Sequence, residues 1–203
     1  MKTALSFLAM GTLFTASALA QQTERRIVAE GGGPDDRASA RVLYWNTKTD
    51  SAAGQFAIDY GRPVWKKIYE DPAQFDRMTK GKVWRLGSNF WTTLATDLPL
   101  KISGQDVPAG SYYLGLQRSA DGSRWSLAFI DPAGASREHL DAFDIGKAKV
   151  EFVAPVSADK PEATAEKLTI TLSYPKDDFR NVTLKIVWGN LALSAPVKVA
   201  LEE

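Results

Sequence analysis

The chain of 203 residues contains no cysteine and a single histidine, His139. The lack of cysteine excludes disulfide bonds and a lipid-modified N-terminal cysteine. Zinc sites need clustered cysteine and histidine ligands, so we expect no metal. A Ser-His-Asp triad would have to combine His139 with Asp141 or Asp144, but the chain has no Gly-x-Ser-x-Gly nucleophile elbow. These absences favour a binding role over an enzymatic one.

An excess of charge is also lacking, because 25 Lys and Arg residues balance 24 Asp and Glu residues. Proteins that bind nucleic acid need a clustered basic face, so we expect no nucleic-acid partner. The run Gly31-Gly32-Gly33 does not connect a strand to a helix. It is therefore not a phosphate-binding loop, and we expect no cofactor. Most of the 6 tryptophans are expected in the core.

The first 20 residues have the pattern of a secretory signal peptide. Lys2 supplies the positive charge, residues 4–16 are apolar, and Ala18-Leu19-Ala20 supplies small residues for the peptidase. The apolar run is shorter than the roughly 20 residues that cross a bilayer. We therefore predict cleavage after Ala20, a periplasmic or secreted protein, and no stable membrane insertion afterwards.

Two further regions follow the signal peptide. Residues 21–40 are polar and include a Gly-Gly-Gly-Pro run, which is typical of a flexible spacer. From residue 41 onward, apolar and polar residues alternate, as in Phe56, Ile58 and Tyr60. This period of two is typical of half-buried strands. We predict that residues 41–203 form one all-β domain, an antiparallel β-sandwich of about nine or ten strands with one or two short helices.

Turn and cap residues refine this fold. Asp121-Gly122 and Gly189-Asn190 each separate two alternating runs and predict β-hairpins. Pro196 lacks an N–H for the ladder, so it predicts that the last strand lies at an edge or is bent. Asp71-Pro72 predicts the start of a helix over residues 73–78, because aspartate caps helices and proline favours their first position. Residues 136–143 are a weaker candidate for a second helix.

Three strings stand out in the middle of the chain: Tyr60-Gly61-Arg62-Pro63, Lys82-Val83-Trp84-Arg85-Leu86-Gly87-Ser88-Asn89, and Pro108-Ala109-Gly110-Ser111-Tyr112. Together they make residues 40–203 resemble a bacterial exported domain-of-unknown-function family, family twenty-nine eleven. In that family an acidic and then a small residue usually follow the asparagine, whereas Phe90 and Trp91 stand here. The change implies either that a catalytic acid is lost or that a binding pocket is more apolar. Residues 71–80 resemble an insertion, and loops of that kind often border sites.

The candidate ligand-binding residues are Arg62, Trp84, Arg85 and Asn89. Pro63 restricts the backbone at Arg62, whose planar guanidinium suits carboxylate or phosphate. Trp84 offers a stacking face, and Arg85 and Asn89 offer donors that orient a ligand. The alternative is structural: the arginines pair with acids such as Asp59 or Asp97, or Trp84 and Leu86 face inward while Arg85 is solvated.

We expect the protein to bind a small molecule or a glycan-like ligand in the cell envelope. A second hypothesis is an envelope hydrolase that uses a carboxylate pair, for which the chain offers Asp59, Asp97, Asp131 and Asp144. A third is an assembly or scaffold protein that joins partners through its edge strands.

Overall fold

The computed structural model describes residues 28–29, 31, 33, 35–159, 161 and 163–201. The predicted signal peptide and most of the predicted spacer lie outside these residues. The chain forms one compact unit over Pro34–Glu203. Its first strand, β1, begins at Arg37, so the predicted boundary at residue 40 falls inside a strand. Among the described residues, no helix is both long and apolar enough to span a membrane.

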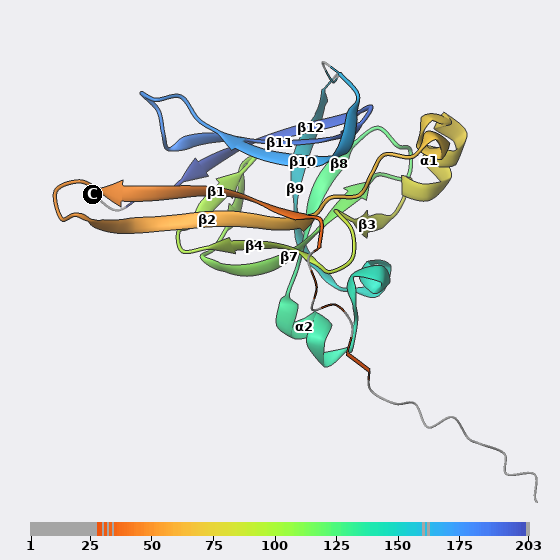
Figure 1. Ribbon diagram of the computed structural model, residues 1–203, viewed down its shortest axis with the longest axis horizontal. Coiled ribbons are helices and arrows are strands. Elements are labelled where there is room, and N and C mark those ends of the chain that lie inside the picture. Colours follow the sequence, from red (N-terminus) through yellow and green to blue (C-terminus); the bar gives the residue numbers. More distant parts are fainter. Residues whose placement is uncertain are drawn as a thin grey trace, which may run out of the picture. The chain divides into compact units, whose positions relative to one another are not determined.

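The domain is an all-β structure, as predicted, built from antiparallel strands (Figure 1). Nine strands follow one another across an unclosed sheet in the order β1, β2, β4, β7, β8, β9, β12, β11, β10. Their bounds are β1 Arg37–Asn46, β2 Ser51–Gly61, β4 Thr92–Thr96, β7 Gly110–Arg118, β8 Trp125–Ile130, β9 Val150–Asp159, β12 Leu191–Val199, β11 Asn181–Gly189 and β10 Ala165–Ser173. Three short strands join them: β3 Val83–Arg85, β5 Leu100–Ile102 and β6 Gln105–Val107.

Side chains from both ends of this order meet in one hydrophobic core. Phe56 and Ile58 of β2 lie in the same cluster as Ile186 of β11 and Leu193 of β12. The strict alternation of apolar and polar residues explains this, because successive side chains of a strand point to opposite faces. β1 and β10 are the two free edges of the sheet, and they lie close to each other without forming a ladder.

Both predicted hairpins are present. β7 and β8 pair from Tyr113 opposite Ile130 to Arg118 opposite Trp125. Their connection is longer than a two-residue turn, and the Asp121 carboxylate holds it by accepting bonds from the backbone N–H and hydroxyl of Ser123, at 3.1 and 2.8 Å. β11 and β12 are joined by the tight turn at Gly189-Asn190.

Pro196 does not mark an edge strand, because β12 lies inside the sheet. On one side β12 pairs with β11 along its length. On the other side it pairs with β9 through residues 192–194 and with β5 through residues 197–199. Pro196 stands between these two partners, where no ladder requires its missing N–H.

The predicted helix at Asp71-Pro72 is α1, Pro72–Thr79, and the Asp71 carboxylate accepts a bond from the Ala73 N–H at 2.9 Å. A 3₁₀ helix, η1, precedes it at Lys67–Glu70. The second predicted helix, residues 136–143, is wrong in its bounds. α2 spans Pro132–Arg137 and the 3₁₀ helix η2 spans Ala142–Lys147. Asp131-Pro132 carries the same cap and proline signal as the start of α1.

Candidate functional site

The first of the three strings, residues 60–63, forms hydrogen bonds with the backbone at the free edge of β10. The Tyr60 hydroxyl accepts a bond from the Ile170 N–H at 2.9 Å and donates to the Ile170 carbonyl at 3.3 Å. The Pro63 carbonyl accepts a bond from the Leu168 N–H at 3.1 Å. Tyr60 and Pro63 thereby satisfy backbone groups that would otherwise stay unpaired at the edge.

The first and second strings lie directly against each other. A Cβ atom added to Gly61 would stand 2.2 Å from the carbonyl oxygen of Ser88. Only glycine allows this approach, because any other side chain would collide with the backbone. The first two of the three strings therefore meet in space.

Arg62 has structural partners. Its Nε donates to the Leu168 carbonyl at 3.3 Å, and its Nη1 lies 4.0 Å from Asp36. Asp36 also accepts a bond from Lys167 at 2.8 Å, and this bond is the main cause that lowers the pKa of the Asp36 carboxyl. Arg62 thus forms the structural ion pair that the alternative predicted, but its partner is Asp36 and not Asp59 or Asp97. Asp59 instead pairs with Arg37.

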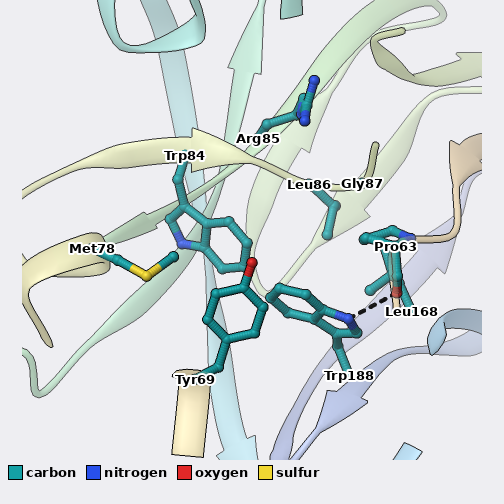
Figure 2. A pocket seen from close by; sticks show the side chains of 9 residues that line it. All are labelled: Pro63, Tyr69, Met78, Trp84, Arg85, Leu86, Gly87, Leu168 and Trp188. Carbon is teal, nitrogen blue, oxygen red and sulfur yellow. Dashed lines mark hydrogen bonds between the residues drawn. The ribbon is translucent and has the colours of Figure 1, made fainter. Parts of the chain in front are cut away.

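Beside the two strings lies a pocket of about 190 Å³, which we call the aromatic pocket (Figure 2). Tyr69 comes from η1, Met78 from α1, Trp84 from β3 and Trp188 from β11. The complete lining is Pro63, Tyr69, Met78, Trp84, Arg85, Leu86, Gly87, Leu168 and Trp188. The aromatic rings contact one another, with centroids 5.8 Å apart for Trp84 and Trp188 and 5.0 Å apart for Tyr69 and Trp188.

The indole N–H groups of this region differ in their partners. Trp188 donates to the Pro63 carbonyl at 2.9 Å (Figure 2). The Nε1 atoms of Trp84 and Trp65 are buried and have no hydrogen-bond partner. Trp65 packs edge-on against Trp188, with ring centroids 5.0 Å apart, outside the lining of the pocket. Because buried polar groups are nearly always paired, the free N–H of Trp84 at the pocket wall is unusual.

Arg85 lies on the same short strand as Trp84, but its guanidinium points away from the rings of Tyr69 and Trp188 (Figure 2). Its Nη1 donates to the Asn89 carbonyl at 3.1 Å, and the guanidinium lies 4.1 Å from the ring centroid of Phe143. Burial lowers the pKa of Arg85, and the charge of Asp141 partly opposes this. Trp84 and Arg85 therefore do not present one common surface, and the alternative with Trp84 and Leu86 facing inward is the observed one.

Asn89 and the two residues after it lie outside the pocket lining. The Asn89 side chain donates to Asp35 at 2.7 Å, and its backbone is left-handed, with φ of 60°. Trp91 stacks on Tyr113 with centroids 4.5 Å apart, and Phe90 is 54% exposed. Phe90 and Trp91 thus do not make this pocket apolar. The insertion-like stretch does border it, because it forms α1 and contributes Met78.

Three of the four carboxylates considered for hydrolysis have structural partners. Asp59 pairs with Arg37, Asp131 caps α2, and Asp144 pairs with Lys147 at 2.5 Å. His139 is exposed. Within the described ranges, no group of three or more His, Asp or Glu side chains is placed to hold a metal ion.

Of the four candidate residues, Trp84 and Arg85 line the pocket. Sequence reasoning missed Tyr69, Met78, Leu168 and Trp188. The inward position of Trp188 follows from the alternation of β11. Its meeting with β3 and η1 does not, because these segments are separated by about a hundred residues and nothing local encodes their approach.

Residues 45–197 match the model of the family described as protein of unknown function, DUF2911. Searches of curated proteins and of solved structures find no match. Since the match covers most of the chain, the protein belongs to the DUF2911 family.

Proposed function

We propose that this DUF2911 protein is an exported binding protein of the cell envelope that holds a small, neutral, mostly apolar ligand in the aromatic pocket. The single observation that carries the proposal is the buried N–H of Trp84, which has no partner and stands in the wall of a pocket formed by two of the resemblance strings. A ligand that carries a hydrogen-bond acceptor would satisfy it.

The size and lining of the pocket define the ligand class. An apolar protein cavity of about 150 Å³ holds one benzene molecule. The aromatic pocket, at about 190 Å³, has room for such a ring with one small substituent. Tyr69, Trp84 and Trp188 offer aromatic contact, while Leu86 and Leu168 add aliphatic contact. Binding sites for small molecules commonly combine such an apolar lining with a few polar groups.

The charge of the ligand follows from the lining. Arg85 is the only lining residue that is charged at neutral pH, and its guanidinium is directed elsewhere. A charged ligand would lose its hydration without gaining a partner, at a cost of several kcal/mol. A neutral ligand avoids this cost, so the pocket favours neutral molecules over carboxylates or ammonium ions.

Met78 gives the ligand a route to the N–H of Trp84. The nitrogen edge of the Trp84 ring is turned toward the side on which Met78 lies (Figure 2). Met78 is 37% exposed and has an unbranched side chain with three rotatable bonds. Rotation of this side chain uncovers the N–H without moving the strand that carries it.

The experiment compares two nearly isosteric ligands, acetophenone and α-methylstyrene, in which a carbonyl oxygen is replaced by a methylene group. We expect acetophenone to raise the melting temperature of the protein more, because only its oxygen can accept the bond from Trp84. In the Trp84→Phe variant this preference should vanish. The loss of one hydrogen bond corresponds to about a fivefold to tenfold weaker affinity for acetophenone.

Trp45→Phe is the matched control, because Trp45 lies outside the lining of the pocket. It should leave the preference for acetophenone unchanged. Equal stabilisation by the two ligands in the unmodified protein, or an undiminished preference in Trp84→Phe, would refute the role of Trp84. The absence of any stabilisation by either compound would refute the pocket as a site for small neutral rings.

A further inference from the structure

A second concave site lies where the two free edges of the sheet approach each other, and we call it the seam groove. It has a volume of about 350 Å³. One wall is the end of β1 with the facing part of β2, and the other is the connection between β10 and β11. The lining consists of Leu43, Tyr44, Trp45, Asn46, Ala53, Tyr174, Phe179, Arg180 and Leu201.

Three aromatic side chains of this groove are exposed, unlike those of the aromatic pocket. The exposed fractions are 52% for Trp45, 47% for Tyr174 and 45% for Phe179. These residues come from segments about 130 positions apart, and the fold brings them to one groove. Exposed aromatic rings that gather in a concavity indicate an interaction site, because on ordinary protein surfaces exposed apolar residues are scattered singly.

Polar contacts hold the Trp45 ring and the backbone of the opposite wall in place. The indole N–H of Trp45 donates to Asp50 at 3.2 Å. The Tyr44 hydroxyl donates to the Phe179 carbonyl at 3.0 Å, and burial raises the pKa of Tyr44 to about 12. The backbone carbonyl of Arg180 accepts a bond from the Val199 N–H at 2.9 Å. Both walls are thus organised before any ligand arrives, which lowers the entropic cost of binding.

A β-bulge lies at the same place. Tyr44 is opposite Gly54 and Trp45 is opposite Ala52, so Ala53 has no partner on β1. Ala53 itself lines the groove. Bulges bend a strand and change the direction of neighbouring side chains, and they are frequent beside functional sites.

Polar groups accompany the rings. The side-chain oxygen Oδ1 of Asn46 accepts bonds from the backbone N–H groups of Lys48 at 2.9 Å and Thr49 at 3.2 Å, so the NH₂ group of the same side chain is the part that can donate to a ligand. Arg180 and the hydroxyl of Tyr174 add further polar atoms. The volume is at the lower end of the range for small-molecule sites, about 300–1,000 Å³.

We propose that the seam groove binds a saccharide. A sugar ring has an apolar C–H face that packs on an aromatic ring and a rim of hydroxyl groups that bond to polar side chains such as amides. The groove offers both kinds of group over the space of one or two sugar rings. This site is separate from the aromatic pocket and takes a different class of ligand.

The test follows the indole N–H signals of the protein by NMR during titration with cellotriose, maltotriose and triacetylchitotriose. We expect at least one of them to shift the Trp45 signal saturably and to leave the Trp84 and Trp188 signals in place. Isothermal titration calorimetry then measures the affinity of the variants, and Trp45→Ala and Tyr174→Ala should each weaken that binding about tenfold, because each removes one stacking ring. Tyr174→Phe keeps the ring and should retain most of the affinity.

Phe90→Ala is the matched control, since Phe90 is an equally exposed aromatic residue outside the groove. It should not change the affinity. The proposal is overturned if none of the three saccharides shifts the Trp45 signal at millimolar concentration, or if Trp45→Ala binds as well as Phe90→Ala. It is also overturned if sedimentation shows a dimer that Trp45→Ala abolishes, because the groove would then be a surface for self-association.

Discussion

The aromatic pocket and the seam groove contain the same types of aromatic residue, but these residues differ in exposure and in the partners of their N–H groups. In the pocket, Trp84 and Trp188 pack on each other and mainly stabilise the core, and one N–H is left without a partner. In the groove, Trp45 and Tyr174 are about half exposed, and the indole N–H of Trp45 has a partner. The number of aromatic residues therefore does not distinguish a core from a site. Exposure does. An unpaired polar atom indicates a site only where it adjoins a cavity, because the N–H of Trp65 is also unpaired but lies outside the pocket lining.

The largest expected difference between the two regions concerns stability. Trp188 is only 6% exposed and contacts Trp65, Tyr69 and Trp84. Trp188→Ala should lower the free energy of unfolding by about 3–5 kcal/mol, because it leaves a large cavity. Trp45→Ala should change it by about 0.5 kcal/mol or less, as is usual at surfaces. Denaturant unfolding measures both, and similar losses would contradict the assignment of Trp45 to a surface site.

A smaller effect separates the two tryptophans of the pocket. Trp188→Phe and Trp84→Phe remove similar volumes, but only the first removes a hydrogen bond, the one to the Pro63 carbonyl. Trp188→Phe should therefore be more destabilising by about 1 kcal/mol. Denaturant unfolding of the two variants side by side tests this. If Trp84→Phe costs as much or more, its N–H has a partner in the folded protein.

The wall of the seam groove depends on Tyr44. Tyr44→Phe removes the bond to the Phe179 carbonyl and should cost about 1 kcal/mol at neutral pH. Because the pKa of Tyr44 is raised by burial to about 12, from an ordinary value near 10, its contribution is complete below pH 10. It is lost as the pH rises from 10 to 12, since only the unfolded chain then ionises this hydroxyl readily. The variant should show a shallower loss of melting temperature over this pH interval, and equal slopes would contradict this.

As the pH is lowered, we expect α1, which borders the pocket, to lose structure before β1, which borders the groove. Asp76 of α1 pairs with Lys80 at 2.6 Å and with Arg118 at 2.7 Å, and these bonds, that of Lys80 first, lower the pKa of its carboxyl. The contribution of Asp76 is therefore present above the ordinary pKa near 4 and is lost as the pH falls through the lowered value. Hydrogen-exchange protection of α1 should fall before that of β1 as the solution is acidified.

Asp76→Asn should lower the protection of α1 at neutral pH and remove most of this early acid dependence. Asp106→Asn is the control, because Asp106 pairs with Lys101 on an exposed part of the surface. The control should leave α1 unchanged. Simultaneous loss of protection in α1 and β1 would show that α1 has no separate acid sensitivity.

Local signals in the sequence predicted the strands, the hairpins and the first helix. Alternation placed Phe56, Ile58 and Tyr60 inside, and Asp71-Pro72 marked the start of α1, because both patterns act within a few residues. The same cap signal at Asp131-Pro132 went unrecognised. The edge position predicted from Pro196 is wrong, because proline is tolerated there through a change of partner between β9 and β5, which is a property of the whole sheet.

The candidate site was predicted only in part. Trp84 and Arg85 both line the pocket, but their side chains point to opposite faces of β3, as the period of two requires. Arg62 and Asn89 pair with Asp36 and Asp35 just before β1, and no local pattern relates positions so far apart in the chain. Trp188 lines the pocket because the order of strands in the sheet brings β11 next to β3 and η1. The alternation of apolar and polar residues predicts the face of a strand on which a side chain lies. It does not predict which distant residues that side chain contacts, because tertiary packing determines those contacts.

The indole N–H resonance of Trp84 gives the most direct test of the account. The signal is assigned by its absence in Trp84→Phe, and acetophenone is added while the spectrum is recorded. The account predicts a saturable downfield shift of this resonance, because the free N–H gains an acceptor. A Trp84 signal that stays in place while acetophenone binds, or while it shifts only the signals of other tryptophans, would contradict the central claim.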